Sequence, residues 1–183
     1  MLNAYLSTMT RIVQQERGTI DKYIGDAIMA FWNAPVDLTD HATRAVRTAL
    51  AMQAALAQLN QEFAARNWPE VRIGVGVNTG RMSVGNMGSE FRMSYTVMGD
   101  AVNLGSRLEG ITKQYGVGIL VTQPTVEADP AHVFMKIDDV RVKGKEKPVA
   151  IYEPLGEKDG LDGAARQAAA DFEAAYALYQ KQD

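Results

Sequence analysis

Two β-prone runs, residues 19–24 and 27–32, are separated only by Gly25 and Asp26. A two-residue connection with glycine in the first turn position is typical of a tight antiparallel hairpin. The sequence therefore predicts a strand pair with Asp26 at its tip. Any fold proposed for the chain has to contain this antiparallel pair.

Helices and strands alternate along the rest of the chain. Apolar residues spaced three and four apart predict helices over residues 2–17, 40–68, 100–115 and 164–180. Further β-prone runs predict strands over residues 71–79, 93–98, 117–122, 134–142 and 149–152. We expect strands 71–79 and 93–98 to be neighbours in one sheet, and the last two strands to form another hairpin. This mixture favours an α+β fold, a ferredoxin-like sandwich with a mainly antiparallel sheet, over a doubly wound fold.

The composition narrows the class of protein. A chain of 183 residues that is 46% hydrophobic can form one full core but not two ordinary domains. With 19 basic and 22 acidic residues, it lacks the positive field that would hold a nucleic acid. The absence of cysteine excludes disulfides and thiolate metal sites and suits a reducing cytoplasm. No apolar run approaches the roughly 18 residues of a membrane span.

Lys22 and Asp26 each allow a structural and a functional interpretation. Strand alternation places Lys22 on the same face as Ile20 and Ile24, so a cation interrupts an apolar row. A lysine on an edge strand often only reaches water, and Gly-Asp suits a tight turn for conformational reasons alone. The functional alternatives are a binding contact for Lys22 and a hard oxygen ligand for Mg²⁺ at Asp26.

Asn103 and Arg107 lie four residues apart on a predicted helix and therefore share a face. An amide and a guanidinium in this arrangement can orient a ribose and neutralise charge on a phosphate. A solvated helix surface is the alternative explanation for the pair.

Other candidate residues carry weaker signals. The glycines at positions 74, 76 and 80 do not form a dinucleotide motif, because they lie in a strand and not in a strand-to-helix turn. The lysines around Gly144 are either phosphate contacts or ordinary loop charges. His41 and His132 lack the spacing of metal ligands, so we expect surface or capping positions for both.

Together these fragments resemble the catalytic domain of class III adenylyl and guanylyl cyclases. The resemblance rests on GTIDKYIGDAIMAF at residues 18–31 and YTVMGDAVNL at residues 95–104, supported by Arg107 and the VKGK loop at residues 142–145. Order and spacing match over residues 2–154. The resemblance implies a nucleotide cyclase domain over residues 1–156, and we expect a flexible linker and an amphipathic helix over residues 157–183.

The resemblance implies an adenylate cyclase, a phosphorus–oxygen lyase that makes 3′,5′-cyclic AMP and pyrophosphate from ATP for signal transduction. Lys22 would donate to adenine N1, and the Thr96 hydroxyl would accept from the N6 amino group. Guanine presents the opposite pattern, so a guanylyl cyclase favours an acceptor where Lys22 stands. Many adenylyl cyclases have aspartate where Thr96 stands. Threonine resembles the class IIIb subgroup, and a neutral acceptor would avoid a second buried charge beside Lys22.

The family also implies the catalytic residues. Asp26 would be one of two carboxylates that hold two divalent cations, Mg²⁺ or Mn²⁺, for attack of the ribose 3′ hydroxyl on the α-phosphate. Arg107 would stabilise charge on the α-phosphoryl oxygens, and Asn103 would orient the ribose. Lys143 or Lys145 would contact the outgoing phosphates, and the sequence does not decide between them.

In this family each site takes its metal ligands from one subunit and its base, ribose and arginine contacts from the other. Lys22 and Asp26 would then serve different sites of a homodimer. The family's first metal aspartate lies in an Asp-Ile/Leu-x-Gly-Phe motif on a strand before the first helix, and this sequence begins after that point. We therefore expect weak or absent activity from the chain itself and an open sheet edge.

The resemblance further implies a cytoplasmic domain with an upstream sensor domain in the parent protein. A catalytically inactive cyclase-like domain that binds nucleotide or regulates a partner is one alternative, and a guanylate cyclase is another. A diguanylate cyclase of related fold is a third, but its Gly-Gly-Asp/Glu-Glu-Phe signature is absent.

Overall fold

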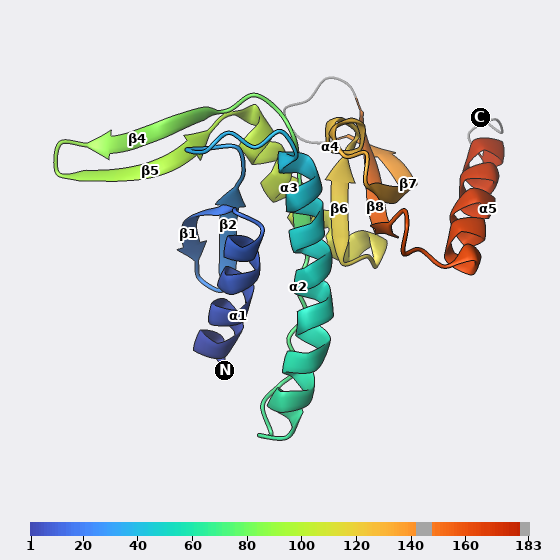
Figure 1. Ribbon diagram of the computed structural model, residues 1–183, viewed down its shortest axis with the longest axis horizontal. Helices are drawn as coiled ribbons and strands as arrows, with labels where there is room; N and C mark the ends of the chain where they lie inside the picture. The colour runs from blue at the N-terminus through green and yellow to red at the C-terminus, as the bar shows by residue number, and fades with distance from the viewer. Residues whose placement is uncertain (142–147, 180–183) are drawn as a thin grey trace.

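The computed structural model describes residues 1–141 and 148–179 of the chain (Figure 1). Its helices are α1 (Leu2–Gln15), α2 (His41–Ala64), α3 (Asp100–Tyr115), α4 (Gln123–Ala128) and α5 (Gly163–Tyr179). Its strands are β1 (Thr19–Ile24), β2 (Ala27–Phe31), β3 (Val75–Val77), β4 (Ser83–Ser89), β5 (Arg92–Met98), β6 (Ile119–Thr122), β7 (His132–Val140) and β8 (Val149–Glu157). Among these strands only β3 and β6 pair in parallel, so the predicted α+β fold with mainly antiparallel pairing is confirmed.

The described strands form three groups. β1 pairs with β2, β4 pairs with β5, and the remaining strands form a four-stranded sheet in the order β3-β6-β8-β7. Both predicted hairpins are confirmed. In the first, Ile24 pairs with Ala27, and Gly25 has a φ of 65°, a conformation that favours glycine.

One sheet prediction is wrong, because strands 71–79 and 93–98 are not neighbours. β3 pairs with β6, whereas β5 pairs with β4, which lies in the glycine-rich stretch between them. The segment before β3 is bonded to α2 instead of to a strand. The Asn60 amide donates to the Val71 carbonyl at 2.8 Å and accepts from the Val71 N–H at 2.9 Å, and the Gln53 amide donates to the Ile73 carbonyl at 3.1 Å. These side chains shorten the strand to three residues.

A β-bulge at Asp21 changes the faces of β1. Ile20 pairs with Ala30 and Lys22 pairs with Met29, so Asp21 is an extra residue without a partner in this register. Because an extra residue reverses the alternation, Ile20 and Lys22 lie on opposite faces. The expectation that they share a face is wrong, whereas Lys22 and Ile24 do share one.

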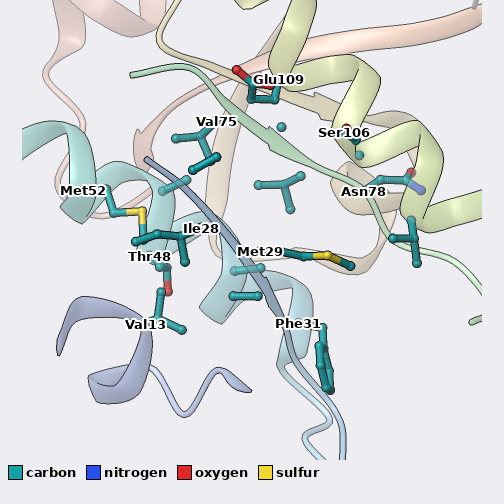
Figure 2. A pocket seen from close by; sticks show the side chains of 18 of the residues that line it. Val13, Ile28, Met29, Phe31, Thr48, Met52, Val75, Asn78, Ser106 and Glu109 are labelled. Atoms are coloured by element: carbon teal, nitrogen blue, oxygen red, sulfur yellow. The ribbon is translucent and has the colours of Figure 1, made fainter. Parts of the chain in front are cut away.

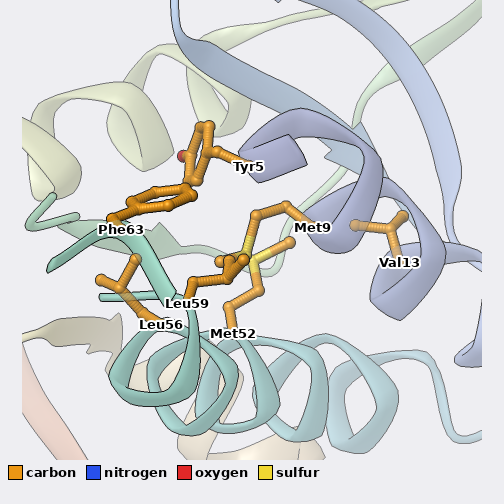
Figure 3. Packing of buried hydrophobic residues seen from close by; sticks show 7 residues of the cluster. All are labelled: Tyr5, Met9, Val13, Met52, Leu56, Leu59 and Phe63. Carbon is orange, nitrogen blue, oxygen red and sulfur yellow. The ribbon is translucent and has the colours of Figure 1, made fainter. Parts of the chain in front are cut away.

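Helices α1 and α2 pack together through the cluster Tyr5, Met9, Val13, Met52, Leu56, Leu59 and Phe63 (Figure 3). The four-stranded sheet lies between α2 and α3. Ile119 and Val121 of β6 pack against Val46 and Ala49 of α2, and Leu120 packs against Leu108 of α3. All four residues of β6 are buried, so this strand is the centre of the core.

Close packing between β3 and α3 explains why residue 76 is a glycine. A Cβ atom at Gly76 would clash with the backbone of Gly105 and Glu109. The glycine therefore lets β3 lie directly against α3, which agrees with the rejection of a dinucleotide motif. None of the described helices combines the length and the apolar character needed to cross a bilayer.

The C-terminal helix α5 packs against β7. The Lys136 ammonium lies 5.3 Å from the centre of the Tyr176 ring, and the Tyr176 hydroxyl donates to the Asp138 carboxylate at 3.3 Å. The Tyr115 hydroxyl of α3 donates to the same carboxylate at 2.7 Å. Burial, followed by the contact with Asp138, raises the pKa of Tyr115 to about 12.

Candidate functional site

Lys22 on β1 and Thr96 on β5 meet although 74 residues separate them. The Lys22 ammonium donates to the Thr96 hydroxyl oxygen at 3.4 Å. Thr96 is buried, whereas 47% of the Lys22 side chain is exposed. The structure therefore brings together the two residues that the family resemblance assigns to the base, with Lys22 at the solvent side.

Asp21 is a third member of this group, and the sequence analysis missed it. Its side chain is completely buried, and its Oδ2 accepts from the Thr96 hydroxyl at 2.5 Å and from the Val97 N–H at 3.3 Å. Its Oδ1 lies 3.2 Å from the Lys22 ammonium. The expectation that threonine avoids a second buried charge beside Lys22 is therefore wrong. An acidic residue inside a β-prone run was the available signal.

Asp26 occupies the exposed turn between β1 and β2. Burial raises the pKa of the Tyr5 hydroxyl, and the negative charge of Asp26 raises it further. No hydrogen bond or ion pair links Asp26 to Lys22 or Thr96 in the part of the chain that the structure describes. Within residues 1–141 and 148–179, no three His, Cys, Asp or Glu side chains form a group that could hold a metal ion. A single carboxylate completed by phosphate oxygens nevertheless suits Mg²⁺.

Asn103 and Arg107 lie on α3, which follows β5 directly after Gly99. Asn103 is exposed and Arg107 is half-buried. Their side chains make no hydrogen bond or ion pair with any described residue, so both are available to a ligand. Lys143 and Lys145 lie outside the described residues.

A cavity of about 400 Å³ lies between β2 and β3 (Figure 2). Consecutive residues line it on both sides, 27–32 from β2 and 72–79 from the β3 segment. Because successive strand residues point to opposite faces, lining by consecutive residues means that a strand edge faces the cavity. In the described chain no strand pairs with either of these edges. We call this cavity the edge slot.

The edge slot is distinct from the Lys22–Thr96 pair. Asp26 lines the slot, whereas Lys22, Thr96, Asn103 and Arg107 do not. The slot walls are mostly apolar side chains from α1, α2 and β2, including Val13, Met52 and Ile28 (Figure 2). Its shape and lining therefore suit a polypeptide segment better than a nucleotide.

His132 does not lie at the surface, so that expectation is wrong. The His132 and Asp129 side chains are both fully buried, and His132 Nδ1 lies 2.7 Å from Asp129 Oδ2. The Thr43 hydroxyl donates to Asp129 Oδ1 at 2.8 Å. Burial alone would raise the pKa of Asp129, but the hydrogen bonds from His132, Thr43 and the Ala131 N–H together lower it. His41 is half-buried at the start of α2.

The β4–β5 ribbon extends away from the rest of the molecule (Figure 1). It exposes large apolar side chains, namely Val84, Phe91, Met93, Tyr95 and Met98. Phe91 is 97% exposed. Exposed apolar residues gathered on one element are typical of an interaction surface.

Comparisons with known proteins identify the family and the fold. The family model described as "Adenylate and Guanylate cyclase catalytic domain" matches residues 1–153. Adenylate cyclase 1 of Rhizobium meliloti (strain 1021) is 39% identical over 157 residues, which cover 85% of this chain and 24% of that protein. The chain therefore spans about a quarter of the length of this relative.

Two solved structures have a similar fold. The adenylyl cyclase CyaB from P. aeruginosa is 34% identical, with a TM-score of 0.80 over 88% of this chain and 83% of that one. The guanylyl cyclase Cya2 is 36% identical, with a TM-score of 0.79 over 88% of this chain and 81% of that one.

Proposed function

The chain belongs to the adenylate and guanylate cyclase catalytic domain family, and we propose that it converts ATP into 3′,5′-cyclic AMP and pyrophosphate. The observation that carries this choice of substrate is the 3.4 Å contact between the Lys22 ammonium and the Thr96 hydroxyl. The Rhizobium relative, named as an adenylate cyclase, supports it.

The two side chains match the edge of adenine. An ammonium can only donate, which suits the lone pair of adenine N1, and a hydroxyl oxygen can accept from the N6 amino group. Guanine has a hydrogen on N1, so the Lys22 ammonium would meet a donor there instead of an acceptor. Because the Lys22 ammonium contacts the Thr96 hydroxyl, it would move from the hydroxyl to N1 as the base enters.

The catalytic roles are those that the family resemblance implies, and they are supported by side chains of α3 and the hairpin turn that lack partners among the described residues. Asn103 would hold the ribose, and Arg107 would stabilise charge on the α-phosphoryl oxygens as the 3′ oxygen bonds to the α-phosphorus and pyrophosphate leaves. Asp26 would hold divalent cations, which neutralise the triphosphate and lower the pKa of the 3′ hydroxyl when bound. Phosphate contacts of Lys143 or Lys145 stay a prediction.

A second carboxylate would come from an extended segment in the edge slot. Such a segment could pair with the open edges of β2 and β3 and would lie beside Asp26, which lines the same slot. Because Asp26 alone supplies half of the family's carboxylate pair, we expect weak activity from the chain by itself. The extended chain is defined here as this chain preceded by a strand with the Asp-Ile-x-Gly-Phe motif.

The proposed active state is a homodimer with two shared sites. Asp26 makes no contact with Lys22 or Thr96 within the described chain, as expected if these residues serve different sites. The apolar β4–β5 ribbon offers a surface for the second copy. Signal transduction under the control of an upstream sensor domain, in the cytoplasm, completes the proposal.

A cyclase assay with Mn²⁺ tests the function. The chain and the extended chain are each given ATP or GTP, together with their Lys22→Glu variants. We expect cyclic AMP as the main product, more of it from the extended chain, and a loss of ATP preference in Lys22→Glu. Dominant production of cyclic GMP by the parent would refute the base assignment.

The same assay distinguishes an active cyclase from the alternative, an inactive domain that only binds nucleotide. The feature that favours this alternative for the chain alone is that Asp26 is only one of the two metal carboxylates that the family resemblance implies. Binding of ATP without turnover by the extended chain would establish it.

A further inference from the structure

Asp21 is a buried carboxylate that the proposed reaction does not use. Its side chain has no exposed surface, and an unpaired charge in such a place is costly. Two donors meet Oδ2, the Thr96 hydroxyl at 2.5 Å and the Val97 N–H at 3.3 Å. Oδ1 accepts no hydrogen bond from the described residues, although the Lys22 ammonium lies 3.2 Å away.

This arrangement fixes the Thr96 proton. A hydroxyl has one hydrogen and two lone pairs, and an ionised carboxylate can only accept. The Thr96 hydrogen therefore points to Asp21, and the side of the oxygen that faces Lys22 carries lone pairs only. The hydroxyl cannot then rotate to donate to a ligand without leaving the buried carboxylate oxygen short of a partner.

The orientation of the Thr96 O–H bond allows the site to discriminate between adenine and guanine. A free threonine hydroxyl is ambiguous, because it can accept from the 6-amino group of adenine or donate to the 6-oxo group of guanine. A threonine held by Asp21 can only accept. The bulge in β1 makes this possible, since it turns the Asp21 side chain inward beside Lys22.

We propose that Asp21 is a positioning residue that determines base specificity by locking Thr96 as a hydrogen-bond acceptor for the 6-amino group of adenine. The proposal rests on the proposed function, since it concerns how the same site chooses its base. Asp21 would not touch the nucleotide. It would act only through the Thr96 hydroxyl.

Nucleotide binding by the full chain tests this role without turnover. Affinities for α,β-methylene-ATP and α,β-methylene-GTP are measured by calorimetry for the parent, Asp21→Leu and Asp21→Asn. Loss of one buried hydrogen-bond partner predicts a fall of about 10- to 100-fold in the ATP-to-GTP affinity ratio for Asp21→Leu. Asp21→Asn keeps an acceptor for the Thr96 hydroxyl, so we expect it to retain most of the ratio.

A Thr96→Val background is the matched control. Once the hydroxyl is gone, Asp21→Leu should change the ATP-to-GTP affinity ratio no further. If Asp21 only stabilised the fold, Asp21→Leu would have the same effect on binding in this background as in the parent. A parent that prefers ATP, together with an Asp21→Leu variant of unchanged ratio, would overturn the role of Asp21 alone. A parent without any ATP preference would overturn the proposed function as well.

A second measurement needs no variant and so does not depend on folding. The parent is given the triphosphates of purine riboside and 6-methoxypurine riboside, which both keep N1 as an acceptor. A locked acceptor faces the methoxy oxygen with a lone pair, so we expect weaker binding of the methoxy compound. Equal or tighter binding of it would show a hydroxyl that is free to donate and would contradict the proposal.

Discussion

Two buried carboxylates, those of Asp21 and Asp129, fix the arrangement of the side chains around them. Asp21 and Asp129 are both acidic residues without exposed side-chain surface, and each is held by hydroxyl donors, Thr96 in one case and Thr43 in the other. A buried carboxylate persists only where such partners compensate its desolvation. Each aspartate therefore fixes the geometry of the side chains around it.

Asp129 predicts how stability depends on pH. Folding lowers its pKa, so the folded state favours the charged carboxylate. Its stabilisation is complete above the ordinary aspartate pKa of about 3.9 and is lost as the pH falls through the lower folded value. Urea unfolding of the parent and of Asp129→Asn from about pH 7 to pH 2 measures this.

We expect Asp129→Asn to lose about 1–3 kcal/mol of unfolding free energy at pH 7, with the difference narrowing toward low pH. Asp37→Asn, at an exposed position, is the control and should behave like the parent. A constant difference between parent and Asp129→Asn at every pH would show that the charge of Asp129 does not contribute.

For single residues, the sequence identified members of the candidate site better than it predicted which side chains are buried and what they contact. The Lys22–Thr96 pair followed from the family resemblance, and the structure brings the two together. An acidic residue inside a β-prone run was the one signal for Asp21, and it was missed because the sequence does not reveal the bulge that turns this side chain inward. His132 was assigned to the surface because spacing alone does not reveal the carboxylate that pairs with it in the core.

Among the elements, the contact between β3 and α3 is sensitive to substitution at Gly76. Gly76→Ala would place a methyl group against the backbone of Gly105 and Glu109, where no side chain can move aside. Forcing an extra carbon into packed backbone predicts a loss of about 1–3 kcal/mol. Urea unfolding measures the change.

Gly85→Ala on β4 is the matched control, since an added methyl group there meets no atom within 4 Å. We expect it to remain near the parent in stability. Equal losses for the two variants would mean that the strand–helix contact is not the cause.

Local turn chemistry made both hairpins predictable, but two strands were not. β4 lies in a stretch so rich in glycine that it resembled a connection. The start of the predicted strand 71–79 is instead bonded to the amides of Asn60 and Gln53. Those bonds come from a helix earlier in the chain, so no local pattern could indicate them.

For the whole molecule, the α+β class was predictable from the alternation of helices and hairpins. The division of the sheet around the edge slot was not, because it depends on which strand edges remain unpaired in three dimensions. The proposed dimer joins these features, since it needs the turn of one copy and helix α3 of the other at each site.

Mixing two defective variants of the extended chain tests this shared site most directly. Asp26→Asn removes the proposed metal carboxylate and Arg107→Ala the proposed α-phosphate contact, so each variant alone should make almost no cyclic AMP. In a one-to-one mixture, half of the dimers would be mixed, and each would regain one intact site of two. The account predicts about one quarter of the parent activity. A mixture no more active than its separate components, although both variants fold and dimerise, would contradict it.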